Sequence, residues 1–131
     1  MQNLIKAAIY GAVIGDALGV PFEFTEREKL IENPVKDMVG YGTYYKPIGT
    51  WSDDSGLILA TLDGLNTPFN IKDVAWNFIE WESDNKYMQK NVFDIGRTTA
   101  GSIYELRKSI DNDILEFGTS VNDNGNGSLM R

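Results

Sequence analysis

The sequence predicts an all-α domain. Apolar residues recur at three- and four-residue spacing in several segments, which is the periodicity of helices that each bury one face. No run of β-branched residues alternates over more than a few positions, so no strand is expected. With 131 residues, 42% of them hydrophobic, the chain has the size and composition of one globular domain with a single core.

The first helix is predicted from about Leu4 to Leu18, with Asn3 as a candidate cap. Its apolar stripe comprises Leu4, Ile5, Ala8, Ile9, Ala12, Val13 and Ala17. Glycines spaced four apart form a second stripe, Gly11, Gly15 and Gly19. Because a glycine stripe lets another backbone approach closely, we expect tight packing there. Polar residues interrupt the apolar stretch from Ala7 to Phe24, so neither a membrane span nor a signal peptide is expected.

A short second helix and a long loop follow. Thr25 and Glu28 have the spacing of a capping box, which predicts a helix from Glu26 to Glu32, ending before Pro34. Between positions 35 and 51 no period persists, and glycines and a proline punctuate a cluster of tyrosines. This pattern predicts a long ordered loop, and loops of that length often serve function.

The next two helices are predicted close together. Ser52 is a candidate N-cap for a helix that ends near Gly64 and buries Leu57, Ile58, Thr61, Leu62 and Leu65. Asn70 opens another helix, which continues to about Glu82 and carries a core stripe of Ile71, Val74, Ala75, Phe78 and Ile79.

A last helix is expected after the loop Asp94–Arg97. Thr98 or Thr99 is its candidate cap, and its apolar residues are Ile103, Leu106, Ile110 and, in an extension of the helix, Ile114. The segment from Gly118 to Gly127 is predicted to be a loop.

The charge and the missing residue types limit the chemistry. Nineteen acidic residues face twelve basic ones, for a net charge of -7, and no segment concentrates Lys and Arg, so no nucleic-acid partner is expected. The absence of Cys fits a reducing compartment, and we expect a cytoplasmic protein with no membrane partner. Without Cys or His, a metal site must be built from oxygen donors, which suits Mg, Mn or Ca.

Adjacent carboxylates at a helix start are the strongest chemical signal. Ser52, Asp53 and Asp54 place a hydroxyl and two carboxylates around one point, an oxygen set that hard cations prefer. The alternative is that Ser52 caps the helix while the two aspartates complement its dipole. Taken alone, the pattern favours this second interpretation.

Two other acidic residues lie in apolar surroundings. Buried carboxylates are costly unless they are paired or bind a cation, so Asp16 and Glu23 either line a site or bond to backbone groups. For Asp16 we favour bonds to the loop that follows it, and for Glu23 both interpretations stay open. Near the end, the glycine-rich run from Asn122 to Gly127 is either a surface turn or a left-handed turn whose backbone amides approach a ligand. The sequence alone favours the surface turn.

Four motifs in order carry a family resemblance: Gly11–Gly19 with Pro21 and Glu23, then Gly49–Ser55, then Phe93–Gly96, then Gly125–Arg131. Together they resemble the ADP-ribosylglycohydrolase family, over the whole chain. The resemblance reverses the preference for a simple cap at Ser52.

The resemblance implies an all-α orthogonal helical bundle that holds two divalent ions, Mg or Mn, and a hydrolase that removes ADP-ribose from a protein side chain or a related acceptor. The implied metal ligands are Ser52, Asp53 and Asp54. The implied catalytic residues are Glu23, which we assign as the base by hypothesis, and Asp94. The implied substrate-binding residues are Gly96, Asn126, Gly127 and Ser128.

The chain departs from the family in one respect. Family members are considerably longer and complete the metal site with an Asp-x-Asp-Ser/Thr motif, which has no match in this sequence. We therefore expect residues 1–131 to be a single, truncated N-terminal part of the domain, with weak metal binding. We also expect a homo-oligomer, or pairing with a chain that carries the missing half. The alternative function is a non-catalytic fragment that binds ADP-ribose or a protein partner.

Overall fold

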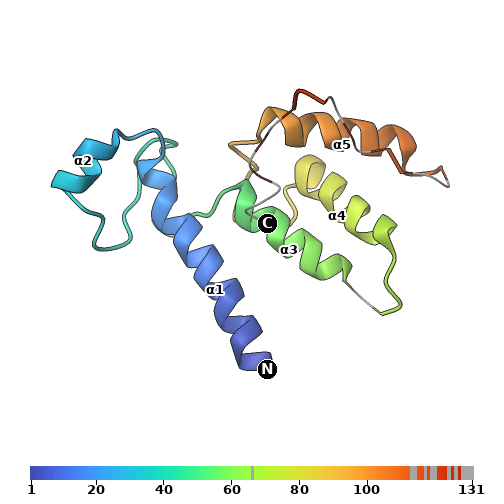
Figure 1. Ribbon diagram of the computed structural model, residues 1–131, viewed down its shortest axis with the longest axis horizontal. Helices are drawn as coiled ribbons and strands as arrows, with labels where there is room; N and C mark the ends of the chain where they lie inside the picture. The colour runs from blue at the N-terminus through green and yellow to red at the C-terminus, as the bar shows by residue number, and fades with distance from the viewer. Residues whose placement is uncertain are drawn as a thin grey trace. The chain divides into compact units, whose positions relative to one another are not determined.

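The structure is a computed structural model that describes residues 1–65, 67–112, 115–116, 118, 121–123, 125 and 127. In these residues all regular structure is helical, as Figure 1 shows, and the predicted all-α class is confirmed. The elements are α1 (Gln2–Gly19), the 3-10 helix η1 (Val20–Phe22), α2 (Arg27–Glu32), α3 (Asp53–Gly64), α4 (Ile71–Asp84) and α5 (Arg97–Ser109). The chain forms two compact units, Met1–Ser55 and Gly56–Arg131.

The helices lie where the periodicity placed them, but most predicted caps are wrong. Helix α1 begins before Asn3, α2 has Glu26 rather than Thr25 as its N-cap, and α5 begins at Arg97, so its threonines lie within the first turn. The N-caps of these three helices make no side-chain cap bond. Asn70, in contrast, caps α4 as predicted, because its side chain accepts a hydrogen bond from the backbone N–H of Lys72.

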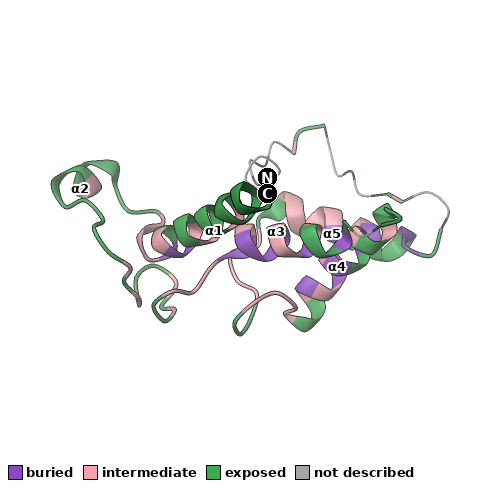
Figure 2. Ribbon diagram, turned by 90° about the horizontal axis from the view of Figure 1, so that it is seen from below, coloured by how far each residue is buried: buried purple, intermediate pink, exposed green. Residues whose placement is uncertain are grey.

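Helix α1 is largely exposed within the first unit. Ala17 is its buried residue, whereas Leu4 and Ile14 are 75% and 50% exposed, and Figure 2 shows most of the helix as exposed. The expected tight packing at the glycine stripe is wrong for the described residues. A Cβ atom added at Gly11, Gly15 or Gly19 would have no neighbour within 4 Å. The stripe therefore faces open space.

The segment Gln2–Phe22 also has the length and composition of a helix that can cross a membrane, with a mean hydropathy of 1.4. Its polar residues therefore do not exclude a span on composition alone, contrary to the expectation from the sequence. Core helices of soluble proteins and signal sequences meet the same criterion, so the property assigns no location to the chain.

Residues 35–51 form a loop without helix or strand, as predicted, and part of this loop lies against η1. The backbone N–H of Thr43 donates to the carbonyl of Pro21 over 3.0 Å, and the Thr43 hydroxyl donates to the carbonyl of Glu23 over 2.6 Å. Gly42 passes so close that a Cβ there would lie 1.9 Å from the Pro21 oxygen. The loop thereby fixes the backbone on both sides of Phe22.

The core of the chain lies in the second unit, where α4 packs against α5. Its buried residues are Leu57, Ala75, Ile79, Trp81, Ile103, Leu106 and Ile110. Three residues predicted to be buried are instead exposed, Leu62 (37%), Leu65 (54%) and Ile71 (52%). They lie at the end of α3 and the start of α4, beyond the part of these helices that the core covers.

A polar network joins the ends of α3 and α4. The Lys86 ammonium donates to Glu80 Oε2 over 2.6 Å and to Asn77 Oδ1 over 3.0 Å. The Tyr87 hydroxyl donates to the Asp63 carboxylate over 2.5 Å. The hydrogen bond that Lys86 donates to Glu80 holds the pKa of Lys86 above its usual value, and burial raises the pKa of Tyr87. Both groups therefore stay protonated around neutral pH.

A glycine permits a close contact between α3 and a core side chain of α4. A Cβ at Gly56 on α3 would lie 2.4 Å from the indole nitrogen of Trp81 and 2.7 Å from the sulfur of Met88. Trp81 is fully buried, so its ring has little room to move aside. Close packing against Trp81 therefore requires a glycine at position 56.

We predict that Gly56→Ala lowers stability, although alanine normally gains about 1 kcal/mol over glycine inside a helix. The added methyl group overpacks the Trp81 contact, which should cost about 1–3 kcal/mol in the free energy of unfolding measured with urea. Equal stability of Gly56→Ala and the unmodified chain would contradict this account.

Candidate functional site

Three of the predicted site residues, Ser52, Asp53 and Asp54, are consecutive and lie together at the start of α3. Ser52 and Asp53 are buried, at 5% and 7% exposed, and Asp54 is half-buried. The Ser52 hydroxyl accepts a hydrogen bond from the backbone N–H of Asp54 over 3.2 Å, so Ser52 does cap this helix. One lone pair of a capping hydroxyl remains for a second partner, so the cap is compatible with a ligand role.

A second cap for the same helix comes from α1. Asp16 Oδ2 accepts hydrogen bonds from the backbone N–H groups of Ser52 (2.9 Å) and Ser55 (3.1 Å), and from the Ser55 hydroxyl (2.5 Å). Asp16 therefore bonds to backbone groups, as the sequence favoured. These groups belong to the start of α3 rather than to the loop directly after Asp16, because a helix start leaves N–H groups without intrahelical acceptors.

As a cation site, this segment supplies part of a ligand set. Its donors are one hydroxyl and two carboxylates, all oxygen, as Mg or Mn requires. Among the residues that the structure describes, no three or more acidic side chains form a group able to hold a metal ion. Hard cations take at least six oxygens. The three donors are of the type that a divalent ion binds, but they are too few to fill its coordination sphere, so further oxygen ligands would have to come from elsewhere.

Glu23, the predicted base, lies in the first unit directly after η1. It is half-buried, and its backbone is extended, with ψ at 144°. The hydrogen bond from Thr43 to its carbonyl fixes that backbone from the long loop. A carboxylate whose backbone is held by a hydrogen bond meets one requirement of a general base, which must be positioned.

The other predicted residues lie in the second unit, around the start of α5. Asp94 is half-buried with a left-handed φ of 59°, a conformation that aspartate tolerates better than most residues. Gly96 is the N-cap of α5. Other residues, such as Tyr41 and Asn85, share this conformation, so the role of Asp94 stays a prediction from the sequence.

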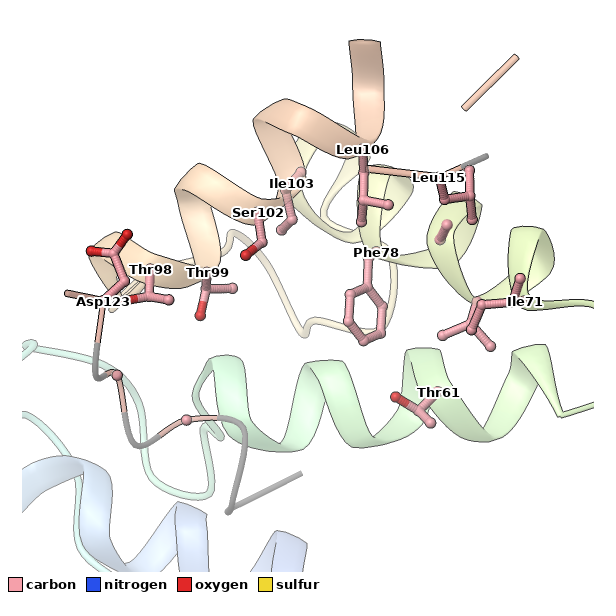
Figure 3. Close-up of a pocket in the computed structure, with 14 residues that line it drawn as sticks. Thr61, Ile71, Phe78, Thr98, Thr99, Ser102, Ile103, Leu106, Leu115 and Asp123 are labelled. Carbon is pink, nitrogen blue, oxygen red and sulfur yellow. The ribbon is translucent and has the colours of Figure 1, made fainter. Parts of the chain in front are cut away.

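A groove of about 450 Å³ lies between α3, α4 and α5, as Figure 3 shows. Its apolar walls include Phe78, Ile103 and Leu106, and hydroxyl groups of Thr98, Thr99 and Ser102 lie along the α5 side. The remaining lining residues are Thr61, Ile71, Val74, Ala75, Leu115, Asp123, Gly125 and Gly127.

Gly125 and Gly127, which belong to the C-terminal glycine-rich run, line this groove together with Thr98 in the first turn of α5. A Cβ at Gly125 would lie 2.9 Å from the Thr98 hydroxyl, so this glycine permits a close approach. Gly127, predicted to bind substrate, lines the groove with Thr98. Asn126 and Ser128, predicted with it, lie outside the described residues.

The sequence did not identify several residues at these places. The sequence predicts Thr98 and Thr99 only as candidate caps and assigns no role to Ser102, whereas Asp123 belongs to the predicted glycine-rich run without a role of its own. Polar residues on the core side of an otherwise amphipathic helix were the available signal for Thr98, Thr99 and Ser102. For Asp16, the partners at the start of α3 are too distant in sequence for any local pattern to show them.

Comparison with known proteins identifies a family that the sequence matches and several similar proteins. The ADP-ribosylglycohydrolase family matches residues 1–131. A protein of Acanthamoeba polyphaga mimivirus named as a candidate ADP-ribosyl glycohydrolase, L543, is 32% identical over all of the chain and 41% of its own length. Proteins named ADP-ribosylarginine hydrolase Tri1 from Serratia proteamaculans and Pseudomonas putida are 33% and 30% identical, over 96% of the chain in each case. The chain spans 34% and 33% of their lengths.

We predict that Ser52→Ala lowers the free energy of unfolding by about 1 kcal/mol, because the N–H of Asp54 loses its acceptor. Asn70→Ala removes the equivalent cap of α4 and should have an effect of similar size, since both side chains accept from the second backbone N–H of a helix. Urea unfolding followed by circular dichroism measures both. A Ser52→Ala chain as stable as the unmodified one would show that the hydroxyl does not cap α3.

Proposed function

Since the chain belongs to the ADP-ribosylglycohydrolase family, we propose that it carries the N-terminal part of a metal-dependent hydrolase that removes ADP-ribose from a protein side chain. Arginine is the acceptor to test first, because two relatives are named ADP-ribosylarginine hydrolases. The alternatives are another side chain, a nucleotide or a small molecule.

The observation that carries this proposal is the start of α3. A hydroxyl and two carboxylates occupy successive positions of a buried, doubly capped helix turn. Helix capping alone requires one acceptor side chain at this place, and Ser52 already provides it. Two further carboxylates at the same turn exceed what capping requires, and together with the hydroxyl they form the oxygen set that hard cations prefer.

Ser52, Asp53 and Asp54 would hold the divalent ions, Mg or Mn, and bound ions would orient the ribose hydroxyls and lower the pKa of water. In the reaction, water attacks the anomeric carbon, and the bond from that carbon to the acceptor nitrogen or oxygen breaks. Glu23 takes a proton from the attacking water, and the departing acceptor takes up one proton, so that in the net reaction the hydroxyl of the water joins the anomeric carbon and its proton joins the acceptor. Asp94, Gly96 and the glycine run at Gly127 contact the ADP-ribose.

The alternative is a chain that binds ADP-ribose or a protein partner without catalysis. The small donor set favours it, because three side-chain donors leave at least half of a six-oxygen sphere to water or to another chain. Catalysis then requires ligands from a second polypeptide segment. The two functions differ in a single measurable property, the release of ADP-ribose.

Pairing is part of the proposal. Helix α1 exposes Leu4, Ile5 and Ile14, at 75%, 55% and 50%, along with its glycine stripe. Apolar helix faces of this kind usually pack against another element. We propose that α1 packs against a second copy of the chain or against a chain that carries the rest of the domain.

We predict that Asp53→Asn and Asp54→Asn each weaken Mn²⁺ binding by about 100-fold or more, because loss of a ligand should exceed the roughly 10–100-fold cost of losing an outer partner. Electron paramagnetic resonance of free Mn²⁺ measures the affinity. Asn70→Ala is the control, because it removes a cap of similar strength far from the acidic turn in sequence, and it should bind Mn²⁺ as the unmodified chain does.

Release of ADP-ribose from an ADP-ribosylated arginine peptide, with Mn²⁺ present, tests catalysis on the same proteins. Turnover that Glu23→Gln abolishes supports the hydrolase and the base assignment, whereas turnover that survives in Glu23→Gln moves the base elsewhere. Binding of ADP-ribose without any release supports the non-catalytic alternative. Unchanged Mn²⁺ affinity in both aspartate variants would contradict the metal site.

We predict that the chain self-associates, since solvent contact of the α1 apolar face is unfavourable. Sedimentation equilibrium should give a mass above that of the 14.7 kDa monomer. Ile5→Lys, on α1 and away from the acidic turn in sequence, should shift the chain toward monomer, and Leu65→Lys, an equally exposed residue after α3, serves as the control. A monomer at all accessible concentrations would be evidence against pairing.

A further inference from the structure

We propose that Asp16 is a positioning residue for the metal-binding segment. Its carboxylate fixes the backbone of Ser52 and Ser55, and so sets the direction in which the side chains of the intervening Asp53 and Asp54 leave the helix. The inference rests on the proposed function, because it assumes that these two aspartates bind a cation.

The geometry places the two aspartates between two anchored residues. Asp16 Oδ2 accepts from the N–H of Ser52 over 2.9 Å and from the N–H of Ser55 over 3.1 Å. All of these groups lie within the first unit, Met1–Ser55. A single oxygen that holds both ends of a helical turn restricts the backbone torsions between them.

The third hydrogen bond locks the carboxylate itself. The Ser55 side chain is fully buried, and its hydroxyl donates to Asp16 Oδ2 over 2.5 Å. Hydrogen bonds to a charged acceptor are shorter and stronger than neutral ones. Because a buried hydroxyl has no water to replace this partner, breaking the bond would leave the Ser55 hydroxyl unsatisfied, which favours the bonded arrangement.

The same bonds argue against Asp16 as a metal ligand through this oxygen. A carboxylate oxygen offers about two lone-pair directions, and three donors already converge on Oδ2. Protein donors, rather than a cation, occupy that side of the carboxylate. Asp16 therefore acts on the cation through the turn that it fixes. Outer partners of this kind typically contribute about 10–100-fold to metal affinity.

Four variants of the full chain test the inference. Asp16→Ala removes the acceptor, whereas Asp16→Asn keeps a carbonyl oxygen of the same reach without the charge. Ser55→Ala removes one of the three donors. Asp73→Ala, which removes an exposed carboxylate from the first turn of α4, is the matched control. Each variant is measured for Mn²⁺ affinity by electron paramagnetic resonance, and for hydrogen exchange of the Ser52 and Ser55 amides by NMR without metal.

We expect Asp16→Ala to lose amide protection at Ser55 and to bind Mn²⁺ about 10–100-fold more weakly. Ser55→Ala should fall between Asp16→Ala and the unmodified chain, while Asp16→Asn should recover most of the affinity and Asp73→Ala should change neither property. The recovery by asparagine is the readout that a direct ligand would not give.

The inference is overturned if folded Asp16→Ala binds Mn²⁺ as the unmodified chain does, or if Asp16→Asn loses as much affinity as Asp16→Ala, since the charge itself would then be what matters. It is also overturned if the Ser55 amide keeps its protection in Asp16→Ala. An unmodified chain that binds no Mn²⁺ refutes the proposed metal site instead; loss of Ser55 protection in Asp16→Ala would then still support the positioning of this turn by Asp16.

Discussion

The start of a buried helix has N–H groups that need acceptors, and this requirement shapes the first unit. At α3 the acceptors are Ser52, which belongs to the helix itself, and Asp16, which belongs to α1. The dipole of α3 also favours negative charge at this end. The same place thus attracts the carboxylates of Asp53 and Asp54 and lowers the cost of keeping them there.

The first and second units carry different parts of the proposed chemistry. The proposed base, Glu23, and the proposed cation ligands, Ser52–Asp54, lie in the first unit, whereas Asp94, Gly96 and the groove at Thr98 lie in the second. The unit boundary falls within α3, directly after Ser55. The proposed cation ligands and the proposed substrate contacts are therefore encoded in separate stretches of sequence, and each can be changed without touching the other.

The sequence predicted the helices well because each one carries its own apolar period, as α4 does from Ile71 to Ile79. It predicted caps poorly, since a cap depends on where a helix begins to within one residue, and α5 begins just before the threonines expected to cap it. The partners of Asp16 were beyond local patterns altogether. The predicted burial of the apolar stripe of α1 was wrong, because periodicity shows which face of a helix is apolar but not whether another element of the chain covers that face. The acidic turn was identified from its motif, and its anchoring only from the structure.

The close packing at Gly56 also gives the chain an internal optical reporter. Trp81 is fully buried against this glycine, and its indole nitrogen has no hydrogen-bond partner in the described structure, so its fluorescence should be shielded from water and from dissolved quenchers. Trp76 is 46% exposed, and Trp51 directly precedes the acidic turn. The three tryptophans thus occupy a dry core, a solvated surface and the border of the proposed cation site, and light emitted by each one carries information about a different region of the molecule.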